Sequence, residues 1–114
     1  MSSAALTRQE IISSLTAMLM ELESLGAPKW IAQRMQDLGI KGTIRHGYAC
    51  PLANYMRHKH PEWSMVLVGP QFVSAYPPQF DDPEGTAVSL HAYPLVEMFT
   101  WCFDAGTYPE LVAR

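Results

Sequence analysis

Proline and glycine divide this chain into short segments, and their positions predict where its helices begin and end. Pro28, Pro51 and Pro94 each open a stretch of helical spacing, and proline is favoured at the first position of a helix. Gly39 and Gly106 follow two of these stretches, where glycine commonly ends a helix. We therefore expect three helices that begin at these prolines.

A longer helix is predicted upstream, over residues 8–25. Thr7 and Glu10 have the spacing of a capping box, and Gly26 can end the helix. Its apolar side chains recur at helical spacing: Ile11, Ile12, Leu15, Met18, Leu19 and Leu22. About two residues separate it from the helix at Pro28, so the two are expected to form an antiparallel helical hairpin.

Three short strands are predicted between the middle and the last helix, at residues 65–68, 72–76 and 86–91. In the third, Val88 and Leu90 are expected to point inward, and a polar, acidic loop precedes it at 79–85. Thr43 and Ile44 could form a further short strand. The expected buried residues of the middle helix are Leu52, Tyr55 and Met56, and those of the last helix are Leu95, Met98, Phe99 and Cys102.

These elements predict the α+β class: a small three-stranded antiparallel sheet with an N-terminal helical hairpin, a middle helix and a C-terminal helix. The chain has 114 residues, which fits a single domain over residues 1–114. Its hydrophobic fraction of 48% and its charged fraction of 17% indicate a packed core rather than disorder. The order of the strands is left open.

Charge and cysteine content predict the surroundings of the protein. The net charge of −3 provides no general attraction to nucleic acid or to anionic membranes. Two cysteines are too few for a disulfide scaffold, although one bridge between them stays open. The N-terminus lacks a basic region followed by an apolar one, and no apolar run approaches the ~20 residues that span a bilayer. We expect a cytoplasmic protein without a membrane anchor.

Cys50 is the best candidate for reactivity. It is expected at the N-cap of the helix that begins at Pro51, where the helix dipole lowers the pKa of a thiol. His46 lies four residues upstream and could act as a base, and Arg45 could supply a cation. An ordinary buried cysteine is the competing interpretation. No complete catalytic set accompanies Cys50, so Cys50 and His46 are weak catalytic candidates.

No metal or cofactor is predicted. His46, Cys50, His58 and His60 have the spacing H-x3-C-x7-H-x-H, which matches no established zinc pattern. The acidic loop at 79–85 lacks the alternation of a calcium-binding loop.

A basic cluster, Arg57 to His60, could contact phosphate together with Arg45 and His46, and Tyr48 could stack on a base. The competing interpretation is a solvated helix end, because positive charge complements the carbonyl pole of a helix. Nucleic-acid binding is therefore the least favoured hypothesis.

Large apolar residues outside the predicted core faces are the more informative signal. Trp30, Trp63 and Trp101 fall away from the apolar face assigned to their element or at its edge, and so does Met20. Some of them can pack beneath loops. If several are exposed together, they form the kind of surface that marks a partner contact or a homodimer. Trp30, Trp63, Trp101, Tyr48 and Arg57 are the candidate binding residues.

Two stretches of the sequence resemble small uncharacterised proteins of actinobacteria and their phages. Residues 42–57 read GTIRHGYACPLANYMR and are similar to a "G…CPLA.YL" element of that group. Residues 94–112, with FDAGTYPELV near their end, look like the tail of the same proteins. The resemblance implies a bacterial or phage-encoded cytoplasmic protein, and it implies no activity and no catalytic residues.

The leading hypothesis is a non-enzymatic protein-interaction module, either a homodimer or a phage-encoded modulator of a host protein. The alternative is a thiol-dependent enzyme or redox sensor centred on Cys50 with His46. The least favoured hypothesis is a nucleic-acid-binding protein that uses the region from Arg45 to His60.

Overall fold

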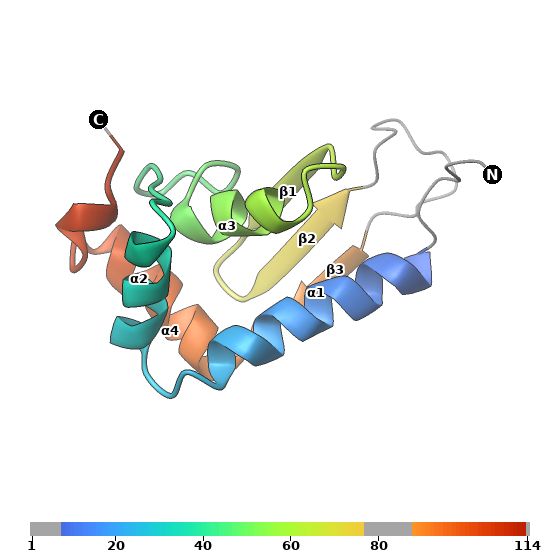
Figure 1. Ribbon diagram of the computed structural model, residues 1–114, viewed down its shortest axis with the longest axis horizontal. Coiled ribbons are helices and arrows are strands. Elements are labelled where there is room, and N and C mark those ends of the chain that lie inside the picture. Colours follow the sequence, from blue (N-terminus) through green and yellow to red (C-terminus); the bar gives the residue numbers. More distant parts are fainter. Residues whose placement is uncertain (1–7, 77–87, 114) are drawn as a thin grey trace.

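The computed structural model describes residues 8–76 and 88–113, and over these residues the fold is α+β, as expected (Figure 1). The elements, in chain order, are α1 (Arg8–Glu23), α2 (Pro28–Asp37), α3 (Pro51–Lys59), β1 (Met65–Val68), β2 (Phe72–Tyr76), β3 (Val88–His91), α4 (Pro94–Asp104) and the 3₁₀ helix η1 (Pro109–Leu111). Thr7 of the predicted capping box and the acidic loop at 79–85 lie outside the described residues.

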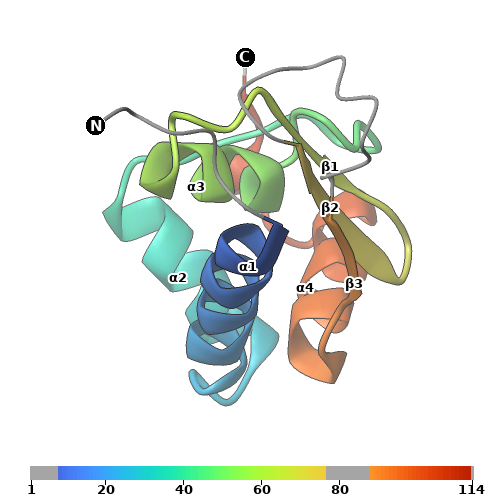
Figure 2. The ribbon, with the colours of Figure 1, turned by 90° about the vertical axis from the view of Figure 1, so that its right-hand side faces the viewer.

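The sheet is an antiparallel meander in the order β1-β2-β3. Val66, Ala75 and Val88 are partners in its register and form one buried row across the three strands. Helices lie against this face, with α3 packed on β1 and α1 packed on β3 (Figure 2). Because side chains alternate between the two faces of a strand, the apolar residues of this row lie between the sheet and the helices that cover it.

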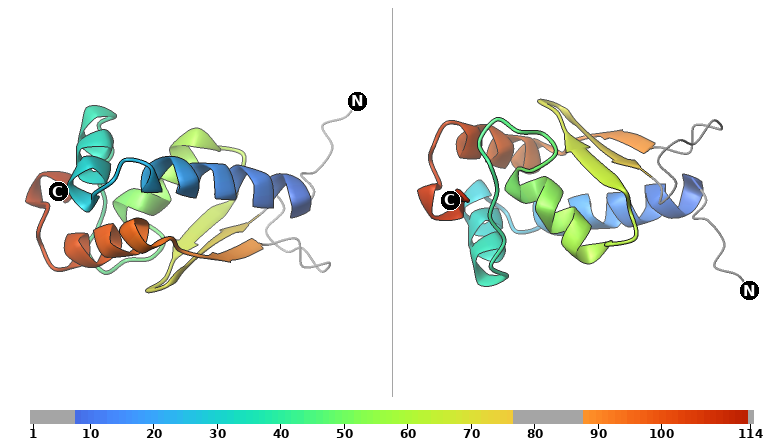
Figure 3. Two further views of the ribbon diagram at one scale, coloured as in Figure 1. Left: turned by 90° about the horizontal axis from the view of Figure 1, so that it is seen from below. Right: turned by 90° about the horizontal axis from the view of Figure 1, so that it is seen from above.

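Both N-terminal helices form where they were predicted, and α2 runs at a steep angle to α1 beyond the end of α1 rather than alongside it (Figure 3). α2 packs chiefly against α4, far downstream in the sequence. The buried face of α2 consists of Ile31, Ala32 and Met35, and Leu38, its C-cap residue, is 42% exposed.

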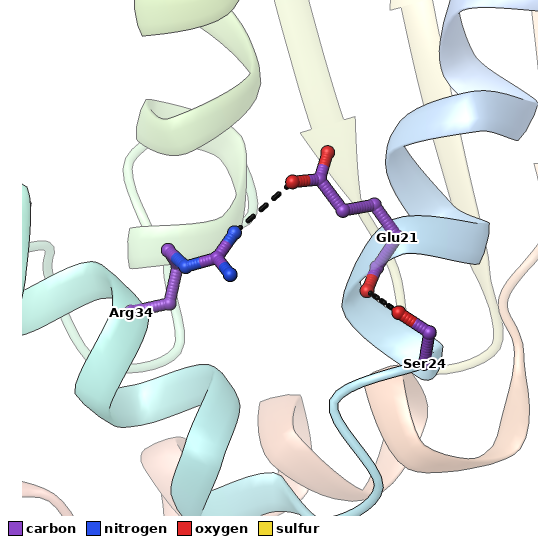
Figure 4. Close-up of polar contacts among 3 residues, drawn as sticks. All are labelled: Glu21, Ser24 and Arg34. Atoms are coloured by element: carbon purple, nitrogen blue, oxygen red, sulfur yellow. Dashed lines mark hydrogen bonds and ion pairs between the residues drawn. The ribbon is translucent and has the colours of Figure 1, made fainter.

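An ion pair joins α1 to α2 at their exposed surfaces. The guanidinium Nη1 of Arg34 lies 3.0 Å from the carboxylate Oε2 of Glu21, and the Ser24 hydroxyl donates to the Glu21 carbonyl at 2.6 Å (Figure 4). Surface pairs of this kind are worth at most about 1 kcal/mol.

The segment between α2 and α3 does not contain the short strand expected at Thr43 and Ile44. Instead, Gly42 forms a parallel bridge with Val112 near the C-terminus. The Gly42 N–H donates to the Leu111 carbonyl at 2.8 Å, and the Ala113 N–H donates to the Gly42 carbonyl at 2.8 Å. This contact joins the start of the segment at residues 43–49 to the chain at and just after η1.

Candidate functional site

α4 carries two of the exposed large apolar residues that the structure describes, Met98 and Trp101. Its buried residues are Val96, Phe99 and Phe103, of which the sequence predicted only Phe99. Met98 is 50% exposed and Cys102 is only partly buried, so the prediction of both as core residues is wrong. The helix is apolar on nearly every side, and periodicity alone therefore could not select the buried face.

Because Val96, Phe99 and Phe103 form the buried face of α4, Trp101 lies on its exposed side. Its side chain is 66% exposed, the highest value among the large apolar residues that the structure describes. Glu97 lies four residues before Trp101 and Asp104 three residues after it, so all three belong to one face of α4. We call Glu97, Met98, Trp101 and Asp104 the outer face of α4.

Trp101 lines a pocket of about 480 Å³ at the C-terminal end of α4. Three segments form its walls: residues 45–47 and Cys50, the turn between β1 and β2 at residues 68–70, and α4 with residues 100, 101, 104 and 105. Arg45 and His46 thus face the same cavity as Trp101, although sequence reasoning assigned them to separate hypotheses. The volume is within the range that holds a small ligand or a few side chains.

Hydrogen bonds fix the loop that carries Arg45 and His46. The ends of the loop are joined by the Thr43 N–H, which donates to the Ala49 carbonyl at 2.8 Å. The Gly47 carbonyl accepts from the N–H of Val68 at 2.9 Å, which attaches the loop to the outer edge of β1. The loop that forms this wall of the pocket is therefore closed at its own ends and attached to β1.

Arg45 has an unusual backbone conformation at this site. Its φ is 58°, which makes it the only non-glycine residue with a positive φ among those described. Its N–H donates to Oδ1 of Asp104 at 2.9 Å. Left-handed conformations of this kind cost energy and cluster at functional sites. The bond to Asp104 compensates part of that cost and joins the loop to α4.

A second, smaller pocket of about 260 Å³ lies on the other side of Trp101. Its lining consists of Pro94, Glu97, Met98 and Trp101. Trp101 therefore separates two hollows, each of which contains one carboxylate of the outer face of α4.

Cys50 lies where it was predicted, at the N-cap of α3, and its Sγ accepts from the Ala53 N–H at 3.5 Å. The expected lowering of its pKa is wrong. Burial raises the pKa of the Cys50 thiol and the Asp104 carboxylate acts in the same direction, and together they outweigh the backbone hydrogen bonds. The residue is only 4% exposed. A buried neutral thiol is the ordinary structural form of cysteine and a poor nucleophile.

The three tryptophans have different surroundings. Trp63 is 3% exposed and its ring stacks on the His60 ring at 4.4 Å between centroids, so it is a core residue and not a surface binding residue. Trp30 is 52% exposed on α2, with the Lys29 ammonium 5.1 Å from its ring centroid. Trp30 lines neither pocket around Trp101.

Tyr48, another candidate binding residue, is exposed, and its ring meets that of His46 edge-on at 6.2 Å between centroids. Tyr48 is thus near the pocket loop but does not line the pocket.

The basic cluster at the end of α3 is engaged within the chain. Arg57 is half-buried and donates to the Asn54 side chain. The Lys59 ammonium lies 5.6 Å from the Tyr55 ring centroid, and His60 Nδ1 lies 2.9 Å from Glu62 Oε2. That hydrogen bond helps to hold the pKa of Glu62 below its usual value, against the opposing effect of desolvation. These contacts favour the interpretation as an ordinary helix end.

Sequence reasoning missed Asp104, Glu97 and the role of Met98. The signal was present in the spacing of Glu97, Trp101 and Asp104, which identifies one helical face once Trp101 is taken as exposed.

Residues 8–76 and 88–113 contain neither a cluster of metal-ligating side chains nor a helix suited to a membrane. No group of three or more His, Cys, Asp or Glu side chains comes together there in a way that could hold a metal ion. None of the helices described is long and apolar enough to cross a membrane.

Comparison of the chain with protein-family models, with curated proteins and with solved structures found no match. The resemblance to small actinobacterial and phage proteins therefore stays a prediction from the sequence.

Proposed function

We propose that this chain is a non-enzymatic protein-interaction module and that the outer face of α4 is its contact surface. The observation that carries the proposal is the exposure of Trp101, 66%, between two pockets. Tryptophan is the residue type most enriched among those that dominate binding energy at protein interfaces. Leaving its large apolar surface in water gives up the stabilisation that burial would supply.

The surroundings of Trp101 support the same proposal. Met98 adds a flexible apolar side chain beside the indole, and methionine is common at binding surfaces. The hydrogen-bonded loop at residues 43–49 is already ordered, so a partner would not have to order it on binding.

The candidate partners are a second copy of the chain and a host protein, and we infer that the protein acts in the cytoplasm. A homodimer would bury Trp101 against its own symmetry mate. A host protein fits the resemblance to phage-encoded proteins. The buried, neutral thiol of Cys50 gives the enzymatic alternative no comparable support.

Two measurements test the proposal. Light scattering on a sizing column over a range of concentrations measures self-association, and a pull-down from bacterial lysate at several bait concentrations tests for a saturable partner. We expect one of the two to detect binding, and we expect Trp101→Ala to remove it.

The matched control is Trp30→Ala, which removes an equally large exposed indole from a different helix. It should leave binding unchanged, and circular dichroism should show both variants folded. A strictly monomeric protein without a saturable partner would contradict the proposal, and so would binding that depends on Trp30 and not on Trp101.

A further inference from the structure

The outer face of α4 combines an exposed aromatic ring with two carboxylates. Glu97 and Asp104 lie one helical turn before and after Trp101, and each lines one of the two pockets that the indole separates. A cation above the face of a tryptophan ring is attracted by the ring quadrupole, and tryptophan is the strongest aromatic partner for such a cation.

Neither carboxylate is neutralised by a cation of the described part of the chain. Asp104 accepts a hydrogen bond from the neutral backbone N–H of Arg45, and no ion pair of Asp104 or Glu97 forms with the described residues. The effect of Asp104 extends to the floor of the larger pocket, because its carboxylate helps to raise the pKa of the Cys50 thiol there.

The larger pocket also contains a positive charge, which opposes the charge of the two carboxylates. Arg45 and His46 line the far wall of the larger pocket and are both exposed to solvent. The Arg45 guanidinium limits the negative potential on that side, whereas the smaller pocket is lined by Glu97 without a cationic residue. The C-terminal end of α4 adds the negative pole of the helix beside Asp104.

We propose that the outer face of α4 binds a basic segment of a partner protein, with an arginine or lysine side chain stacked on the Trp101 indole and paired with the carboxylate of Asp104 or Glu97. This inference rests on the proposed function. Arginine fits best, because its planar guanidinium can stack on an indole while it donates hydrogen bonds to a carboxylate. The aliphatic stem of that side chain has Val68 and Pro70 to contact in the larger pocket.

The charges of the site favour a basic protein segment over a nucleic acid. A nucleic acid presents a row of phosphates, and its binding requires several cations along one groove. Here two carboxylates accompany the aromatic ring, and the net charge of the whole chain is −3. The same charges would repel an acidic protein segment.

The test is an NMR titration of the ¹⁵N-labelled protein, which follows the indole N–H signals of its tryptophans. The probes are four blocked peptides, Gly-X-Gly-X-Gly with X as Arg, Lys, Gln or Glu, and a single-stranded thymidine octamer. We expect the Arg peptide to shift the Trp101 signal and to leave that of Trp30 in place. The Lys peptide should bind more weakly, and the Gln and Glu peptides should not bind.

Variants of the charged residues test whether Glu97 and Asp104 act on the bound peptide or only support the fold, because only the first role changes the affinity for the peptide. Glu97→Gln and Asp104→Asn should each lower the affinity for the Arg peptide by about 2- to 5-fold at low salt, which is the usual contribution of an exposed ion pair. Asp104→Asn keeps an oxygen that can accept from the Arg45 N–H. Arg45→Asn should instead raise the affinity for the Arg peptide by about 2-fold, because it removes a competing cation. Asparagine also tolerates the positive φ at that position.

The outcomes separate this inference from the proposed function. If the Arg peptide does not shift the Trp101 signal, or if the Gln or Glu peptide shifts it equally, the basic-segment inference is overturned. Trp101-dependent binding in the pull-down or in light scattering would then still support an interaction module. Binding of the thymidine octamer at Trp101 would overturn the inference in favour of nucleic acid. If none of the three charge variants changes the affinity for the Arg peptide, the inference is overturned as well.

Discussion

The carboxylate of Glu23 caps α4 by accepting hydrogen bonds from the backbone N–H of Leu95, with distances of 2.9 and 3.1 Å to its two oxygens. The N–H of Val96 donates to the same carboxylate at 3.2 Å. Tyr93, the N-cap residue of α4, makes no side-chain hydrogen bond of its own. The last residue of α1 therefore performs for α4 the function that a local N-cap side chain usually performs.

Replacing Glu23 should destabilise the protein through the loss of this cap. We expect Glu23→Ala to lower the free energy of unfolding by about 1–2 kcal/mol, the usual cost of losing an N-cap side chain. Glu23→Gln should cost less, because the amide oxygen can still accept a hydrogen bond. Urea denaturation measures both. The control is Glu21→Ala, which breaks the surface pair with Arg34 and should cost below about 1 kcal/mol. Equal losses in Glu23→Ala and Glu21→Ala would contradict the capping role.

Gly42 should tolerate no side chain. A Cβ at this position would lie 2.4 Å from the Pro51 nitrogen and 2.6 Å from the Ala49 carbonyl oxygen, both of which are backbone atoms. We expect Gly42→Ala to reduce the free energy of unfolding by about 3 kcal/mol or more, at the upper end of overpacking effects. Thermal or urea unfolding measures the loss.

Gly39→Ala is the control for Gly42, because nothing lies within 4 Å of its added Cβ and only its φ of 72° is unfavourable. It should cost about 1–2 kcal/mol, the usual penalty for a left-handed alanine. If both variants lose the same amount, the close backbone approach at Gly42 is not what requires glycine there.

Tyr55→Phe should leave stability unchanged or raise it slightly. The Tyr55 side chain is fully buried, and its hydroxyl has no hydrogen-bond partner among the described residues. Burial and the Glu21 carboxylate raise the pKa of this phenol and outweigh the opposing effect of the Lys59 ammonium, which lies over the ring without a hydrogen bond to the hydroxyl. Removing a buried group without a partner relieves a desolvation cost of about 1–3 kcal/mol. Differential scanning calorimetry should show an equal or higher Tm. Phe99→Ala, which leaves a cavity at a core position, should in contrast cost about 3–5 kcal/mol. A Tyr55→Phe variant as destabilised as a core truncation would show that the hydroxyl has a partner.

Cys50 should react slowly with iodoacetamide in the folded protein and at an ordinary rate after unfolding. Its thiol is buried and its pKa is raised above the ordinary value of 9.0, so the thiolate is scarce at neutral pH. Mass spectrometry of peptides from a timed reaction measures the rate at each cysteine. Alkylation of native Cys50 as fast as a small free thiol would contradict this environment and support the thiol-enzyme hypothesis.

The same raised pKa predicts a loss of stability in alkaline solution. Below the unfolded pKa of Cys50 the thiol is neutral in both states, and its contribution to stability is fully present. As the pH rises above that value, the unfolded state ionises first, and stability falls until the pH passes the folded pKa. The slope is at most about 1.4 kcal/mol per pH unit for one proton. Cys50→Ser keeps a capping side chain and should remove this part of the pH dependence, as measured by urea unfolding between pH 8 and 10.

Local sequence signals determined where the elements of this protein lie. β1 and β2 occupy residues 65–68 and 72–76, as the sequence predicted, and α2, α3 and α4 begin at the prolines that suit a first helical position. Cys50 is the N-cap of α3 for the same reason. These features depend on a few neighbouring residues, and a sequence displays them directly.

Tertiary structure alone decided which side of α4 is exposed and what lies beside it. Because this helix is apolar on nearly every side, packing against α1 and α2 selected Val96, Phe99 and Phe103 for the core and left Met98 and Trp101 in solvent. Trp63 is buried in the core cluster and stacks on His60, which no local pattern specifies. The pocket is lined by segments far apart in the chain, and the bond between Arg45 and Asp104 in its wall joins positions 59 residues apart. Contacts over such separations form only when the whole chain is folded, so the sequence determined the elements and the folded chain determined the site.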